Sequence, residues 1–294
     1  MTTTVASLVE RVRDLLDDYP DSITTLASAI TDTSTTSIAL ASAAGVAKTN
    51  WLSIDFETLF VDEVPTGPPY TTTVRRGQKG TTAATHASGA TVYVDPLYPS
   101  NRILGCLNAA LGKMTKTVKD IATLTAVDDV YAYTVPSTVE AVKRVEIENS
   151  DETNQFATMR NWEMFDATTL HIFGDYPNTR NIAVIGTAKF TAMSTTGNLD
   201  STYADDNANA INFLIYEAAG QLLLQRQGKI AGRDSFEGIT DPFAQNFPDQ
   251  SVRTAVQYLA QADRYRREAI RQKPILQAPS APTQDPGRSY LART

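Results

Sequence analysis

The segment WLSIDFETLFVDEV, residues 51–64, has the period and the β-branched and aromatic composition of β-strands. Shorter strand-like segments lie on either side of it, and glycines between them mark turns. They are SIALASA (37–43), TTTVRR (71–76) and ATVYVD (90–95). Residues 23–98 are therefore predicted to form a first antiparallel β-module.

Outside this module, apolar residues recur at helical spacing over residues 4–18, 100–122, 204–227 and 249–272. Strand-like segments return between the second and third of these predicted helices. The predicted fold class is α+β, a helical bundle core of about four helices with two inserted antiparallel β-modules and an extended C-terminal tail. The predicted segments are an N-terminal helix (1–22), the first β-module (23–98), a helix (99–125), the second β-module (126–199), a C-terminal helical pair (200–273) and an extended docking tail (274–294).

Composition excludes several classes of protein. The chain has 294 residues, a formal net charge of −7, one cysteine and two histidines. One cysteine rules out a disulfide framework and a zinc site built from cysteines, and two histidines leave little for histidine-based catalysis or metal binding. We expect no membrane span and no secretory signal, because no apolar run is long enough and the N-terminal residues lack the pattern of a signal peptide.

Three local motifs invite a chemical interpretation. Residues 76–82, RGQKGTT, differ from a phosphate-binding loop in glycine spacing and lysine position, so we interpret them as a turn between strands. His86 lies among Ala, Thr, Ser and Gly, which favours a histidine hydrogen-bonded within a β-turn over a catalytic one. Asp205 is better interpreted as a helix N-cap than as a calcium ligand. We therefore predict no enzyme activity, no cofactor and no metal site.

Charge is distributed unevenly along the chain. Residues 249–294 sum to +4, which leaves −11 for the rest. The basic cluster could be a solvated helix face, a docking surface for an acidic protein or, less in keeping with an acidic chain, a nucleic-acid contact. It consists of Arg264, Arg266, Arg267, Arg271 and Lys273. The tail that follows contains four prolines and cannot form a regular element, so we expect a partner to hold it.

One segment resembles a module of tailed-phage virion proteins. Residues 26–64 followed by TVRRGQKGTTAATHASGATVYV (73–94) match it at Arg76, Gly77, Gly80, Thr81, Ala83, His86, Gly89 and Val92. The strand segments of residues 130–190 resemble the second part of head–tail connector proteins, and the helical remainder is similar to adaptors that bind below the portal. The chain thus resembles the connector (neck or adaptor) family.

This resemblance implies a structural protein of the virion neck, assembled in the host cytoplasm. It implies a homo-oligomeric ring, dodecameric to match the portal, through which genomic DNA passes non-specifically, with a neck or tail protein bound below. The tail would dock on the portal together with the basic cluster. The expected apolar anchors are Ile275, Leu276, Tyr290 and Leu291, and the expected polar contacts are Arg288 and Arg293.

Two other functions stay open at this stage. Another tail or baseplate structural protein could contain the same glycine-rich module. A carbohydrate-binding module or an enzyme would need an aromatic platform or a carboxylate pair in a pocket, and neither is evident in the sequence.

Overall fold

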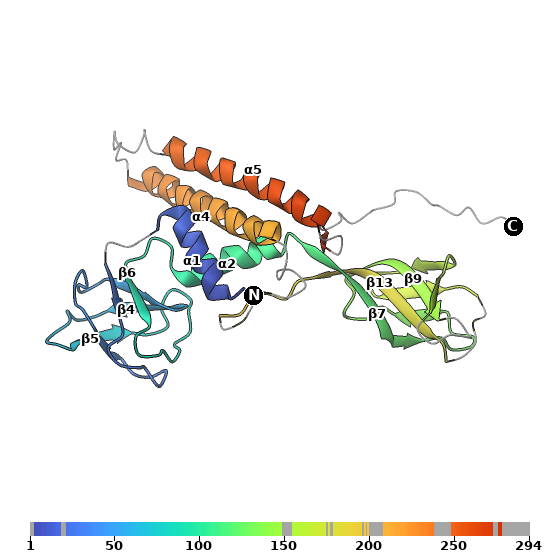
Figure 1. Ribbon diagram of the computed structural model, residues 1–294, viewed down its shortest axis with the longest axis horizontal. Helices are drawn as coiled ribbons and strands as arrows, with labels where there is room; N and C mark the ends of the chain where they lie inside the picture. Colours follow the sequence, from blue (N-terminus) through green and yellow to red (C-terminus); the bar gives the residue numbers. More distant parts are fainter. Residues whose placement is uncertain are drawn as a thin grey trace. The chain divides into compact units, whose positions relative to one another are not determined.

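The computed structural model describes residues 3–18, 22–148, 155–174, 176, 179–195, 197, 199, 208–237, 248–272 and 276–277 (Figure 1). At residues 122, 227–237, 248–250 and 276–277 it describes the backbone but not the side chains. The chain divides into two compact units. Unit 1 comprises Met1–Leu111 and Thr191–Gln272, and unit 2 comprises Gly112–Phe190 and Lys273–Thr294. Unit 2 is therefore an insertion into the sequence of unit 1, completed by the C-terminal segment.

The predicted helical bundle core is wrong. In the described part of the chain, strands outnumber helices, with 14 strands in three sheets beside four helices. Separate clusters of buried side chains lie within the sheets of each unit. The helices do have apolar stripes. A stripe indicates only that one face of a helix packs against something, and it does not show that the core of the protein lies between helices.

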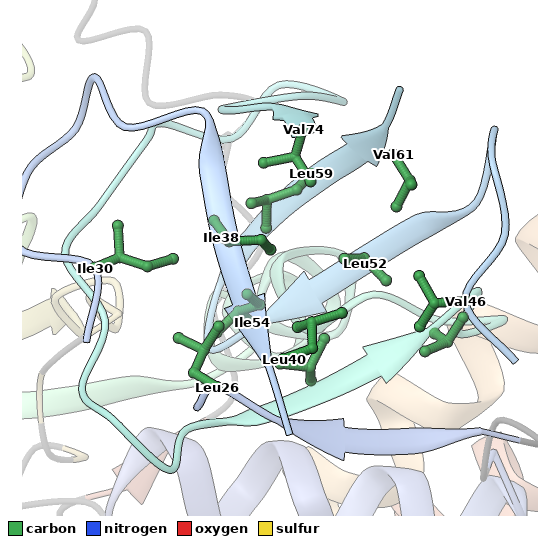
Figure 2. Packing of buried hydrophobic residues seen from close by; sticks show 12 residues of the cluster. Leu26, Ile30, Ile38, Leu40, Val46, Leu52, Ile54, Leu59, Val61 and Val74 are labelled. Carbon is green, nitrogen blue, oxygen red and sulfur yellow. The ribbon is translucent and has the colours of Figure 1, made fainter. Parts of the chain in front are cut away.

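The sheet of unit 1 is antiparallel and curled. Its order is β1-β6-β3-β4-β5-β2, and its two edge strands meet at one end through a bridge between Leu26 and Leu40. Side chains from all six strands or the segments between them fill the inside of the curl, where Figure 2 shows Leu40, Leu52 and Ile54 among the central members. The strands are β1 (Ile23–Thr25), β2 (Ser37–Leu40), β3 (Trp51–Ile54), β4 (Glu57–Val61), β5 (Tyr70–Arg75) and β6 (Thr91–Val94).

The helices of unit 1 pack against one another, and α4 and α5 lie side by side (Figure 1). Gly220 of α4 allows this close approach, because a Cβ atom there would lie 2.8 Å from the side chain of Leu259. Among the described side chains of α5, the buried residues are alanines spaced seven apart, whereas Val252 and Val256 of the predicted apolar stripe are exposed. The helices are α1 (Val5–Leu16), α2 (Ser100–Leu111), α4 (Ala208–Glu237) and α5 (Pro248–Gln272). In the described residues, no helix is long and apolar enough to span a membrane.

The helix predicted over residues 100–122 is shorter than expected. It ends at Leu111, and strand β7 (Thr115–Thr125) begins after Gly112. Glycine favours the end of a helix, and the threonines and other β-branched residues of TKTVKDIATLT favour a strand. The apolar residues recur at helical spacing past Gly112, which had indicated a longer helix. The β-branched residues and the pairing of β7 with β13 instead make this segment a strand.

Unit 2 contains two sheets that share one core. The larger has the order β10-β9-β13-β7-β14 and the smaller the order β11-β12-β8. Leu170 and Ile172 of the smaller sheet join Val145 and Val184 of the larger in one buried cluster. The further strands are β8 (Ala132–Thr134), β9 (Ala141–Glu148), β10 (Phe156–Thr158), β11 (Trp162–Met164), β12 (Thr169–Ile172), β13 (Asn181–Lys189) and β14 (Leu276–Gln277).

Candidate functional site

The Glu57 carboxylate at the start of β4 makes five close polar contacts. Its two oxygens accept hydrogen bonds from the Arg76 guanidinium at 2.7 and 2.6 Å and from the backbone N–H groups of Gly77 and Ala84 at 2.9 and 3.0 Å. The His86 Nε2 lies 2.8 Å from the same carboxylate. Because the Glu57 side chain is fully buried, these partners replace the water that it loses on folding.

His86 bridges two carboxylates. Its Nδ1 lies 2.7 Å from an Asp55 oxygen, opposite the contact of Nε2 with Glu57. Burial lowers the pKa of His86, but the hydrogen bonds and charges of Asp55 and Glu57 outweigh it and raise this pKa to about 9. Burial raises the pKa of Glu57, whereas the bonds from His86, Arg76 and the two amides lower it to about 2.

Asp55, Glu57, Arg76 and His86 form a cluster, here called the Glu57 cluster, that links the hairpin of β3 and β4 to the segment 76–90. With a pKa of about 9, His86 is protonated at neutral pH, and each of its two ring N–H groups faces a carboxylate. Neither ring nitrogen therefore has a lone pair available to act as a general base. A pocket of about 660 Å³ adjoins the cluster and is lined in part by Asp55, Phe56 and Asn101. Of the cluster's carboxylates only Asp55 is well exposed toward solvent, because Glu57 is buried with its partners.

Three of the eight positions that carry the resemblance, Arg76, Gly77 and His86, contact Glu57. Arg76 and His86 contact Glu57 directly, and Gly77 donates its N–H to Glu57 in a left-handed conformation, with φ of 61°. The Thr81 hydroxyl accepts the N–H of Thr58. The segment 76–82 is thus a turn, as predicted, whereas the prediction for His86 missed both of its carboxylate partners.

Stability of unit 1 should depend on pH through this cluster. The pKa of His86 rises from 6.5 to about 9 on folding, so its contribution is complete below pH 6.5 and is lost as pH rises through 9. The pKa of Glu57 falls from 4.5 to about 2, so its contribution to the free energy of unfolding is present above pH 4.5 and is lost as pH falls toward 2.

We expect the midpoint of urea unfolding to fall between pH 6.5 and 9, and this fall to be smaller in a His86→Asn variant. An identical alkaline slope in both proteins would contradict the assignment.

The predicted docking residues are only partly tested by the structure. Arg264, Arg267 and Arg271 are exposed at i, i+3 and i+7 on α5, so one helix face presents all three. Arg266 lies 3.5 Å from Asp263, and Arg271 lies 3.6 Å from Glu268. The backbone of Leu276 lies in β14, opposite Lys116 of β7. The remaining predicted contacts fall outside the described residues: Lys273, Ile275, Arg288, Tyr290, Leu291 and Arg293.

Other candidate positions have structural partners. Cys106 is buried in α2, with its Sγ 3.6 Å from the Gln225 amide nitrogen. Asp205 lies outside the described residues. Within the described part of the chain, no group of three or more His, Cys, Asp or Glu side chains is placed to hold a metal ion.

No protein-family model matches the sequence, and no curated protein and no solved structure shows significant similarity to the chain.

Proposed function

We propose that this chain is a structural adaptor of a phage head–tail connector, a ring subunit that sits below the portal and to which neck or tail proteins attach. The observation that supports it best is the exposed arginine face of α5, formed by Arg264, Arg267 and Arg271. Aligned guanidinium groups on a helix suit an acidic protein surface, because they pair with carboxylates in a fixed geometry.

The charge distribution agrees with this role. Outside residues 249–294 the chain carries a net charge of −11, so a ring of such subunits would repel the phosphates of DNA in its channel. The basic helix and the tail beyond it would instead face the portal. In this proposal the protein performs no catalysis, and its location is the virion neck after assembly in the host cytoplasm.

The arginine face can be tested by charge reversal. We expect Arg264→Glu with Arg267→Glu to abolish binding to purified portal rings, because like charges would then oppose the acidic partner. Reversal of Lys48 and Arg160, two exposed cations outside α5, is the matched control. A chain that ends at Gln277 should bind weakly in the same assay, since it keeps β14 but lacks the tail. Portal binding that survives both changes would refute the proposal.

A further inference from the structure

Unit 2 contains a pocket of about 300 Å³ beside the loop that joins β7 to β8. It is here called the tyrosine pocket (Asp129, Val130, Tyr133, Ile172, Tyr176 and Ile182). Its inner wall includes Ile172 and Ile182, which belong to the buried cluster of the unit. Its outer wall is formed by residues 127–130, all of which are exposed. The pocket therefore leads from the surface to the apolar core, and its volume is at the small end of the range of ligand pockets, about 300–1,000 Å³.

Hydrogen bonds hold the outer wall of the tyrosine pocket in place. The N–H of Ala126 donates to the carbonyl of Arg180 at 2.8 Å, which fixes the start of the loop. The N–H of Val127 donates to the hydroxyl of Tyr133 at 3.2 Å. The N–H of Val130 donates to the carbonyl of Val127, also at 3.2 Å, and closes a tight turn. The pocket is therefore preformed, and a ligand does not have to order the loop when it binds.

The lining of the tyrosine pocket favours a positively charged group. Asp129 is exposed, and its carboxylate makes no hydrogen bond or ion pair with any described residue. Asp128 lines the pocket beside it, whereas no lysine or arginine is among the described residues that line it. The rings of Tyr133 and Tyr176 form further parts of the wall. Because a carboxylate and the face of an aromatic ring both attract positive charge, this combination selects a cation.

The surroundings of the pocket indicate that the cation belongs to a protein. Val127 and Val130 at the rim are 50% and 41% exposed, and the neighbouring Tyr131 is 46% exposed. A free organic cation would leave these side chains in water, whereas a protein surface would cover them. Among basic side chains, arginine suits the pocket best. Its guanidinium is planar and weakly hydrated, stacks on aromatic rings, and can donate two parallel N–H groups to one carboxylate.

We propose that the tyrosine pocket receives an arginine side chain of a different protein. Its guanidinium lies at Asp129 and the tyrosine rings, and the apolar neighbours of the arginine cover Val127 and Val130. The arginine face of α5 suits an acidic partner and this pocket a basic one, so charge directs the two partners to different units. Identification of this partner as the neck or tail protein rests on the proposed function, whereas the chemistry of the pocket does not.

Titration of a short peptide into the isotope-labelled full chain, followed by NMR, tests the pocket without any virion protein. The probe is a capped tripeptide of leucine, arginine and leucine. The matched peptide contains citrulline in place of arginine, which keeps the size and removes the charge. We expect the arginine peptide to shift the amide signals of Asp129, Val130 and Gly174, which line the pocket. It should bind at least about tenfold more tightly than the citrulline peptide, because only a guanidinium forms the charge-assisted bonds.

Asp129→Asn should weaken binding of the arginine peptide about tenfold, since it removes the carboxylate that has no partner within the described residues. Asp17→Asn is the matched control. Asp17 and Asp129 are both exposed and both left-handed, with φ of 51° and 59°, a conformation that asparagine adopts readily. Val130→Ser should weaken binding about threefold by loss of apolar contact, whereas Val64→Ser, at an exposed valine of unit 1, should not change it.

Equal binding of the two peptides, or equal binding to the wild type and to Asp129→Asn, would overturn the proposal. Sedimentation of the full chain alone tests whether a second copy supplies the arginine. Self-association that Asp129→Asn abolishes would overturn the assignment to a different protein. Binding to portal rings is measured separately. If no form of the chain binds the portal, the proposed function fails, while the titration still decides whether the tyrosine pocket binds arginine.

Discussion

Glu57→Ala is expected to destabilise unit 1 by about 3–5 kcal/mol, which is a large part of the roughly 5–15 kcal/mol by which an ordinary domain is stable. The substitution leaves the buried Arg76 guanidinium without its carboxylate. His86 can respond by losing its proton, but arginine cannot. Two backbone amides, of Gly77 and Ala84, lose their acceptor as well. Urea unfolding followed by circular dichroism measures the change.

Two further variants make this prediction specific. Glu63→Ala removes an exposed carboxylate shortly after the same strand and should change the free energy of unfolding by less than about 0.5 kcal/mol. Glu57→Gln combined with Arg76→Met removes both charges while keeping similar volumes, so it should cost less than Glu57→Ala alone. If the double variant is the less stable of the two, an unpaired buried cation is not the cause.

Leu222→Asp in α4 is expected to have an effect of similar or greater size. Leu222 is completely buried, and loss of such a leucine costs about 2–5 kcal/mol before any charge is added. An aspartate at this position would be a buried carboxylate without a partner, which adds several kcal/mol or forces the helix out of the layer. We expect insoluble protein or loss of the cooperative thermal transition.

Leu224→Asp provides the matched control, because Leu224 lies two residues further along the same helix and is 40% exposed. The same chemical change there should leave a cooperative transition within a few degrees of the wild type. A native-like Leu222→Asp monomer would show that this face of α4 is not packed.

Most elements could be predicted from the sequence because their periods are strong. The helix that begins at Val5 and the one that ends at Gln272 lie close to their expected bounds, and the strands around Trp51 were expected. The architecture could not be predicted in the same way. A period shows which face of an element is covered, but it does not show how many strands join into one sheet or which layer holds the core.

The Glu57 cluster was missed for a related reason. In WLSIDFETLFVDEV, residue 57 falls in the same alternating set as Leu59 and Val61, which face the interior. A glutamate at an inward position needs a buried cation, and that signal was present. Identifying Arg76 and His86 as the partners, however, required the fold, since they lie 19 and 29 residues away.

The insertion of unit 2 within the sequence of unit 1 also sets an order of events during synthesis. The β1–β6 sheet is encoded within residues 23–94 and can form as soon as it leaves the ribosome. Helices α1 and α2 pack against α4, which is translated only after all of β7–β13. Until then the apolar faces of α1 and α2 lack the cover that α4 provides. Nascent chains stalled before Ala208 should therefore expose those faces to chaperones, although every strand of the first sheet is already made.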